Sequence, residues 1–124
     1  MKKKLYSTVF WIGICVFFFS ACTNRPDWVV EQFVKYWFKG ELENVKPFLT
    51  PETRECADLL KNVKSPEEFE QMSKIKVKCK ILDVTKQSDS VRMYRCEIAL
   101  DEEKQEMDIC AKRLKHRWFI DITN

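Results

Sequence analysis

The spacing of hydrophobic positions changes near residue 74, which predicts helices before that point and strands after it. Four large apolar residues recur three or four positions apart, as on one face of a helix: Val30, Phe33, Val34 and Trp37. We expect this helix to cover residues 28–38, with Asp27 as its cap and Gly40 as its stop.

Shorter helices are predicted between this helix and residue 74. One covers residues 42–49, with Pro47 limiting its regularity, and the next begins at Thr50-Pro51. The latter should carry its apolar residues along one side: Cys56, Leu59, Leu60 and Val63. Ser65-Pro66-Glu67-Glu68 has the form of a capping box with proline at the first helical position, so a last helix should follow it.

Beyond residue 74 the hydrophobic period is two, which is typical of a strand with one wet face. Four apolar residues there alternate with four lysines: Ile75, Val77, Cys79 and Ile81 with Lys74, Lys76, Lys78 and Lys80. Three further apolar sets lie within residues 94–100, 107–111 and 118–122. Because short polar connections separate these sets, we expect an antiparallel meander of four strands.

The position of the first loop predicts the register of the first hairpin. A loop centred on Gln87 and Ser88 makes apolar residues face one another along the whole ladder. In this register Cys79 faces Cys96 on the core side, where the two could form a disulfide. Two buried free thiols are the alternative.

The amino terminus has the pattern of a bacterial export signal. Three lysines precede an uncharged apolar stretch that closes with Phe19-Ser20-Ala21-Cys22. This ending resembles the lipobox of bacterial lipoproteins, although Leu is usual three positions before the cysteine. We expect a signal peptide over residues 1–21, lipidation of Cys22 and a tether over residues 22–26, with an uncleaved membrane anchor as the alternative.

Removal of the signal would also remove the apparent basic character of the chain. The whole sequence has 22 Lys and Arg against 19 Asp and Glu, and three of the lysines lie in residues 2–4. The remaining chain is neutral, so it lacks the strongly basic character of nucleic-acid binding proteins. We expect no nucleic-acid partner.

Four of the six cysteines remain once the signal and Cys22 are set aside. An even number in an exported domain of this size favours disulfides. Besides Cys79 with Cys96, this leaves Cys56 with Cys110 as a second candidate pair. No Cys-x-x-Cys motif is present and the chain has a single histidine, so we predict no metal site and no cofactor.

Two stretches of the sequence resemble the nuclear transport factor 2-like (cystatin-like) superfamily. One is the helical start, residues 29–42 followed by Leu49-Thr50-Pro51-Glu52, and the other is the closing strand, residues 115–122. The chain is similar to small lipoproteins of Bacteroidota that carry a lumazine-binding-like domain of unknown function. One departure is that His116-Arg117 replaces the usual turn glycine before the final tryptophan.

The resemblance implies an α+β domain over residues 27–124. Its N-terminal helices would pack on a curved four-stranded antiparallel sheet that forms a cone able to hold a pocket. Many surface-exported lipoproteins of that phylum have an acidic run after the lipidated cysteine, and this chain lacks one. We therefore expect a lipid anchor in the cell envelope, in the outer membrane and facing the periplasm.

The sequence contains no recognisable catalytic arrangement. A nucleophile usually needs a neighbouring base, and the one histidine, His116, falls in a predicted turn between charged residues. Asp121 alternates with Ile120 and Ile122, so it should point away from the core. We predict no catalytic residues and expect that the protein is not an enzyme.

Aromatic residues are the first candidate contact surface. Trp28, Tyr36 and Phe38 cannot all share the helix face of Phe33, and Tyr94 lies on a strand. These four aromatic residues could form an exposed patch or line a pocket, although most aromatic residues at such spacings belong to a core.

The lysines of the first strand are the second candidate surface. They would form a basic area for anionic lipid headgroups or an acidic protein if they met three basic residues across the sheet: Arg92, Arg95 and Lys112. A solvated strand face is the plainer alternative.

We expect a membrane-tethered, non-catalytic binding domain of the cell envelope, with the membrane held through the lipid anchor and an envelope protein as partner. The alternatives are a carrier of a small apolar ligand inside the cone and, third, an enzyme of the same superfamily. A pocket with a buried, unpaired polar group would favour the carrier. A flat exposed aromatic patch would favour a protein partner.

Overall fold

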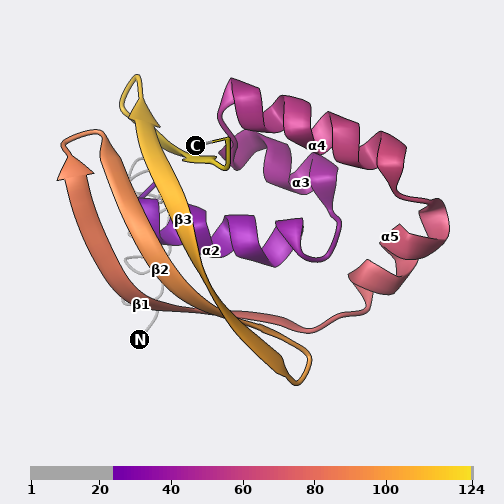
Figure 1. Cartoon of the computed structure of the whole chain (residues 1–124). Helices are drawn as coiled ribbons and strands as arrows, with labels where there is room; N and C mark the ends of the chain where they lie inside the picture. Colours follow the sequence, from indigo (N-terminus) through magenta and orange to yellow (C-terminus); the bar gives the residue numbers. More distant parts are fainter. Residues whose placement is uncertain (1–23, 124) are drawn as a thin grey trace, which may run out of the picture.

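Four antiparallel strands form one sheet in sequence order, which confirms the predicted meander (Figure 1). The computed structural model describes residues 24–123, so the predicted signal peptide and the predicted lipidation of Cys22 lie outside the described residues. The strands are β1 (Val77–Ser88), β2 (Val91–Leu100), β3 (Glu103–Leu114) and β4 (Arg117–Asp121). Two-residue turns at residues 89–90, 101–102 and 115–116 join them.

The helices precede the sheet, and the fold class is α+β as predicted. They are α2 (Pro26–Trp37), α3 (Leu42–Val45), the 3₁₀ helix η1 (Lys46–Phe48), α4 (Pro51–Val63) and α5 (Pro66–Ser73). Local signals start the last two: the Thr50 side chain accepts from the Thr53 amide, and Ser65 with Glu68 forms the predicted capping box. Among residues 24–123, no helix has the length and hydropathy needed to cross a membrane.

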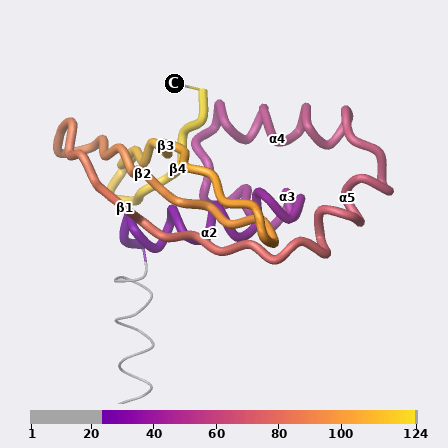
Figure 2. Tube along the Cα trace, turned by 60° about the horizontal axis from the view of Figure 1, so that its bottom comes forward, coloured from indigo at the N-terminus to yellow at the C-terminus, as the bar shows by residue number. Residues whose placement is uncertain are grey.

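Helix α2 lies across one face of the sheet, and the hydrophobic core fills the space between them (Figures 1 and 2). Four residues of α2 are fully buried: Val29, Val30, Phe33 and Val34. They belong to one cluster with the buried residues of the strands: Tyr94, Cys96, Ile98, Ile109, Ala111, Trp118 and Ile120. Burial of each large apolar side chain contributes about 1.5–3 kcal/mol, so this contact holds the domain together.

Helix α2 begins one residue before the predicted cap. Its N-cap is Arg25, which makes no side-chain cap hydrogen bond, so the prediction that Asp27 caps the helix is wrong. Pro26 explains the earlier start, because its fixed φ suits the first helical position and an N–H is not needed there. Asp27 instead accepts a 2.5 Å hydrogen bond from the Tyr94 hydroxyl, which ties α2 to β2.

Helices α4 and α5 extend away from the sheet in both views (Figures 1 and 2). The predicted apolar side of α4 is not its buried side: Thr53 and Ala57 are buried, whereas Leu59 and Val63 are 65% and 79% exposed. The first turns of α4 are held because the Thr53 hydroxyl accepts from the Ile122 amide at 3.1 Å. The second half of α4 therefore projects past the core.

Over Val77–Ile81 the first hairpin has a register two residues away from the predicted one, and beyond the irregularity between Ile81 and Asp83 the difference is larger. Cys79 lies opposite Ile98 and Cys96 opposite Ile81, so the prediction that Cys79 faces Cys96 is wrong. The turn lies at residues 89–90, and two irregularities in β1 absorb the extra residues. Over Val77–Ile81 the shift of two positions keeps each side chain on its own face of the sheet, so the hydrophobic pattern does not detect it.

The two edges of the sheet differ. Beside β4, the Thr50 amide donates to the Ile120 carbonyl at 3.0 Å, and Asn24 is hydrogen-bonded to the backbone of Trp118. Strand β1 is the opposite edge, and its second half, from Leu82 onwards, is exposed. The beginning of the described chain is thus fixed to one edge of the sheet.

Candidate functional site

The predicted aromatic surface is built around Phe48. Trp28 meets Phe48 edge-on with ring centroids 5.3 Å apart, and Tyr36 stacks on it at 6.2 Å. Trp28, Tyr36 and Phe38 are each half-buried. Part of the area of Trp28 and Tyr36 is therefore used to hold η1 against α2, and the rest is accessible to a partner.

Tyr94, the fourth residue proposed for this surface, is completely buried, so it is not part of an exposed patch. Burial and the bond to Asp27 raise the Tyr94 pKa, while a hydrogen bond with Arg92 acts in the opposite direction. The Arg92 guanidinium lies 5.0 Å from the Trp118 ring centroid, and its Nε is buried without a hydrogen-bond partner. These groups form an internal polar contact between α2 and the sheet.

Cys79 and Cys96 are diagonal neighbours on the core face of β1 and β2. In the structure both are thiols, as are Cys56 and Cys110. Cys79 and Cys96 are hydrogen-bonded to each other, which lowers the pKa of Cys79; the same bond, together with burial, raises the pKa of Cys96. The disulfides Cys79–Cys96 and Cys56–Cys110 remain predictions.

The lysines of β1 do not continue into a basic surface. Lys80 lies opposite Glu97, and the Glu97 carboxylate is 3.9 Å from Lys104 Nζ. On the same face, Arg95 forms an ion pair with Glu106 at 3.2 Å. Arg92 lies over Trp118 on the core face, so the hypothesis that the lysines meet it across the sheet is wrong. Alternating charges of this kind are typical of a solvated strand face.

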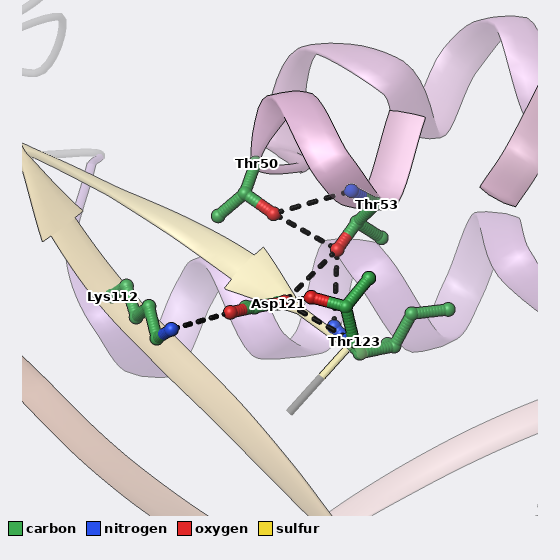
Figure 3. A network of polar contacts seen from close by, with 6 residues as sticks. Thr50, Thr53, Lys112, Asp121 and Thr123 are labelled. Carbon is green, nitrogen blue, oxygen red and sulfur yellow. Dashed lines mark hydrogen bonds and ion pairs between the residues drawn. The ribbon is translucent and has the colours of Figure 1, made fainter. Parts of the chain in front are cut away.

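A buried polar cluster joins β3, β4 and α4 (Figure 3). One oxygen of the Asp121 carboxylate accepts from Thr53 Oγ1 at 3.4 Å, and Lys112 Nζ lies 2.6 Å from the other. The Thr123 amide and hydroxyl also donate to Asp121, at 2.9 and 2.5 Å. Asp121 lies on the sheet face opposite to Ile120, but it is only 5% exposed because these groups enclose it.

The charges of this cluster are fixed at neutral pH. Burial by itself would raise the pKa of Asp121, but the hydrogen bonds from Lys112 and Thr123 outweigh it and lower the pKa to about 2. The pKa of Lys112 is raised, chiefly by its bond to Asp121. Neither group can exchange a proton near pH 7, and Thr53 is fully buried, so we assign the cluster a structural role.

A groove that the sequence pattern did not predict lies between the start of α4 and the β3–β4 hairpin. It encloses about 640 Å³ and is lined by four cationic side chains: Arg54, Arg113, Lys115 and Arg117. The other lining residues are Pro51, Leu114 and Phe119, so no carboxylate is among them. We call this feature the basic groove.

The cations of the basic groove are not neutralised by acids. Within residues 24–123, none of the four forms an ion pair, whereas Lys46, Lys61 and Lys112 each do. The fold positions two of them: Arg54 Nε donates to the Leu49 carbonyl at 3.1 Å, and Arg113 lies 5.9 Å from the Trp118 ring centroid. An anion entering the groove would meet four positive charges, two of which are held in place by the fold.

The β3–β4 turn forms the hairpin side of the basic groove. Lys115 and His116 have φ values of 51° and 73°, the left-handed conformation of a tight hairpin turn. His116 is exposed in this turn, as predicted. The sequence signal for the basic groove was the basic run of residues 112–117. This run does not predict the groove by itself, because Arg54 reaches the hairpin only through the docking of α4.

Among the described residues, no group of three or more His, Cys, Asp or Glu side chains is placed to hold a metal ion. Comparison with known proteins assigns no family: no family model matches the chain, and no curated protein or solved structure shows significant similarity to it. The function of the chain is therefore inferred from its residues and their geometry.

Proposed function

We propose that the chain is a lipoprotein of the bacterial cell envelope, anchored through Cys22, whose nuclear transport factor 2-like domain is a non-catalytic binding domain. The observation that carries this proposal is the docking of Asn24 on β4 beside the basic groove. Asn24 accepts from the Trp118 amide at 2.6 Å and donates to the Trp118 carbonyl at 3.4 Å. The fold therefore begins two residues after the proposed lipidated cysteine.

This short connection limits how far the domain can move from its anchor. Two residues span at most about 7 Å, so the edge of β4 would stay close to the lipid. The residues on either side of Trp118 are Arg117 and Phe119, and both line the basic groove. A binding surface at this place would meet the membrane or something embedded in it.

The packing of α2 on the curved sheet supports the nuclear transport factor 2-like assignment. The positions between α2 and the sheet are filled by side chains without solvent exposure, which favours a surface outside the cone over a ligand carried inside it. Arg92 Nε is the buried, unpaired group that a carrier would need, but its guanidinium is stacked on Trp118.

The state of the titratable groups supports a non-catalytic role. His116 is exposed in a turn, Asp121 and Lys112 are locked in an ion pair, and Tyr94 is buried with a raised pKa. Asp121, Lys112 and Tyr94 are held by their partners, and no nucleophile is placed beside the exposed His116 by the contacts of residues 24–123, whereas nucleophilic catalysis requires a base beside the nucleophile.

An intact-mass spectrum of the protein purified from membranes tests the proposal. We expect the mass of residues 22–124 with acyl chains attached, and Cys22→Ser should abolish both the added mass and retention in the membrane fraction. Cys56→Ser is the matched control and should keep both. A full-length or unlipidated mass from wild-type membranes would refute anchoring through Cys22.

A further inference from the structure

We propose that the basic groove binds the phosphate headgroup of an anionic phospholipid in the membrane that holds the protein. The inference rests on the proposed lipid anchor, because the anchor would keep the groove at the bilayer surface. It adds a second membrane contact, made by side chains, to the covalent one.

The charge of the groove favours an anionic ligand. Its four cations line one groove and form no ion pair within residues 24–123, and their mutual repulsion is relieved when an anion binds between them. Arginine forms short, charge-assisted hydrogen bonds with phosphate oxygens, and three of the four cations are arginines. Pro51, the first residue of the 13-residue helix α4, also lines the groove, so the positive end of that helix adds to the potential.

The apolar lining favours a lipid over a free anion. Leu114 is 42% exposed and Phe119 is half-buried, and both lie beside the cations. Inorganic phosphate has no apolar part to cover these side chains, whereas the glycerol backbone and first methylene groups of a phospholipid do. Burial of apolar surface and neutralisation of charge therefore select the same ligand.

The charge distribution along the domain supports the same orientation. A second groove, of about 820 Å³, lies by the β2–β3 turn and is lined by Asp101, Glu102 and Glu103 beside Lys76. In the meander this turn and the β3–β4 turn lie at opposite ends of the sheet (Figure 1). An anionic bilayer attracts the basic end, which is also the end where Asn24 is docked, and repels the acidic end.

A lipid titration tests the inference. The mature lipoprotein in neutral detergent is titrated with short-chain phosphatidylglycerol, with phosphatidylcholine of the same chain length and with inorganic phosphate, and binding is followed by calorimetry. We expect phosphatidylglycerol to bind about tenfold or more tightly than either of the others. Equal binding of the two lipids, or equal binding of inorganic phosphate, would overturn the assignment to an anionic lipid.

Two charge-matched double variants locate the binding site. Lys115→Gln with Arg117→Gln removes two exposed cations of the groove, and we expect about a tenfold or greater loss of affinity for phosphatidylglycerol. Lys78→Gln with Lys80→Gln removes two exposed cations of β1 and should change the affinity less than about twofold. Equal losses in both variants, or tighter binding of an acidic peptide than of phosphatidylglycerol, would overturn the inference.

The outcomes separate this inference from the proposed function. A lipidated protein that does not prefer phosphatidylglycerol refutes the groove and leaves the anchor standing. An unlipidated protein refutes the anchor, and the titration still measures what the groove binds.

Discussion

Replacement of Asp121 by asparagine changes a charge in the buried cluster with little change in shape. In Asp121→Asn, Lys112 loses its counter-ion, and one hydrogen-bond acceptor becomes a donor that faces other donors. Because the cluster ties the first turn of α4 to the end of β4, the loss should loosen both elements. We expect a folded but less stable protein.

The magnitude follows from the pKa of Asp121. Its value of about 2, against 3.8 for an ordinary aspartate, means that the ionised carboxylate stabilises the fold by about 2 kcal/mol at pH 7. Loss of one partner from a fully buried ion pair costs about 3–5 kcal/mol. Lys112 is 32% exposed and can regain water, so we expect a loss of about 2 kcal/mol.

The pH dependence of stability gives a second check. Because the folded pKa of Asp121 is below the unfolded one, its contribution is complete above about pH 4 and is lost as the pH falls towards 2. Urea unfolding followed by tryptophan fluorescence at pH 7 and pH 3 measures this. The difference between wild type and Asp121→Asn should fall by about half between the two pH values.

Asp108→Asn is the matched control, because Asp108 is an exposed carboxylate on the same face of β3. It should change the free energy of unfolding by less than about 0.5 kcal/mol. The reasoning would be refuted if Asp121→Asn were as stable as the wild type at pH 7. It would also be refuted if the difference in free energy of unfolding between the two were the same at pH 3 as at pH 7.

Three further predictions concern the turn, the internal tyrosine and the thiols. His116→Gly should raise the free energy of unfolding by about 1 kcal/mol, because glycine adopts a φ of 73° without strain, whereas His116→Ala should not; urea unfolding compares the two. Tyr94→Phe removes the hydrogen bond to Asp27 and should lower the free energy of unfolding by about 1–2 kcal/mol in the same assay. The control Tyr36→Phe should lower it by less than about 0.5 kcal/mol, and equal losses would contradict the role given to that bond. In reduced protein, iodoacetamide should label the half-buried Cys56 before Cys96, because Cys96 is fully buried and has a raised pKa. Peptide mass spectrometry gives the order of labelling, and earlier labelling of Cys96 would show that the core is open there.

The elements that could be predicted from the sequence are those fixed by nearby residues. The capping box at Ser65 and Glu68, the N-cap at Thr50 and the alternation of β2 depend on side chains within a few positions of one another. The interactions that form them are the same in most surroundings, so the pattern was sufficient.

The parts that could not be predicted depend on contacts between distant segments. The register of β1 on β2 differs by two positions over Val77–Ile81, which leaves the hydrophobic pattern there unchanged, and the irregularities that set it are not visible in composition. The spacing of the apolar residues of α4 does not show which side is buried, because α4 is docked through Thr53 on Asp121 and Leu59 and Val63 remain outside.

The same reason explains why the candidate site was only partly found. The basic residues of the β3–β4 turn are adjacent in the sequence, but they form a groove only because α4 brings Arg54 and Pro51 to them. Tyr94 was placed on a strand correctly, but nothing in its spacing showed that Asp27 would meet its hydroxyl.

The open edge of β1 has a consequence for a protein that would be concentrated on a membrane. Anchored copies diffuse in two dimensions and meet often, and an unpaired strand edge is a place where another strand can add and start aggregation. Lys78 and Lys80 are exposed along this strand, and a second copy that added there would bring like charges together. We expect the repulsion between these lysines to prevent β1 of one copy from pairing with β1 of another.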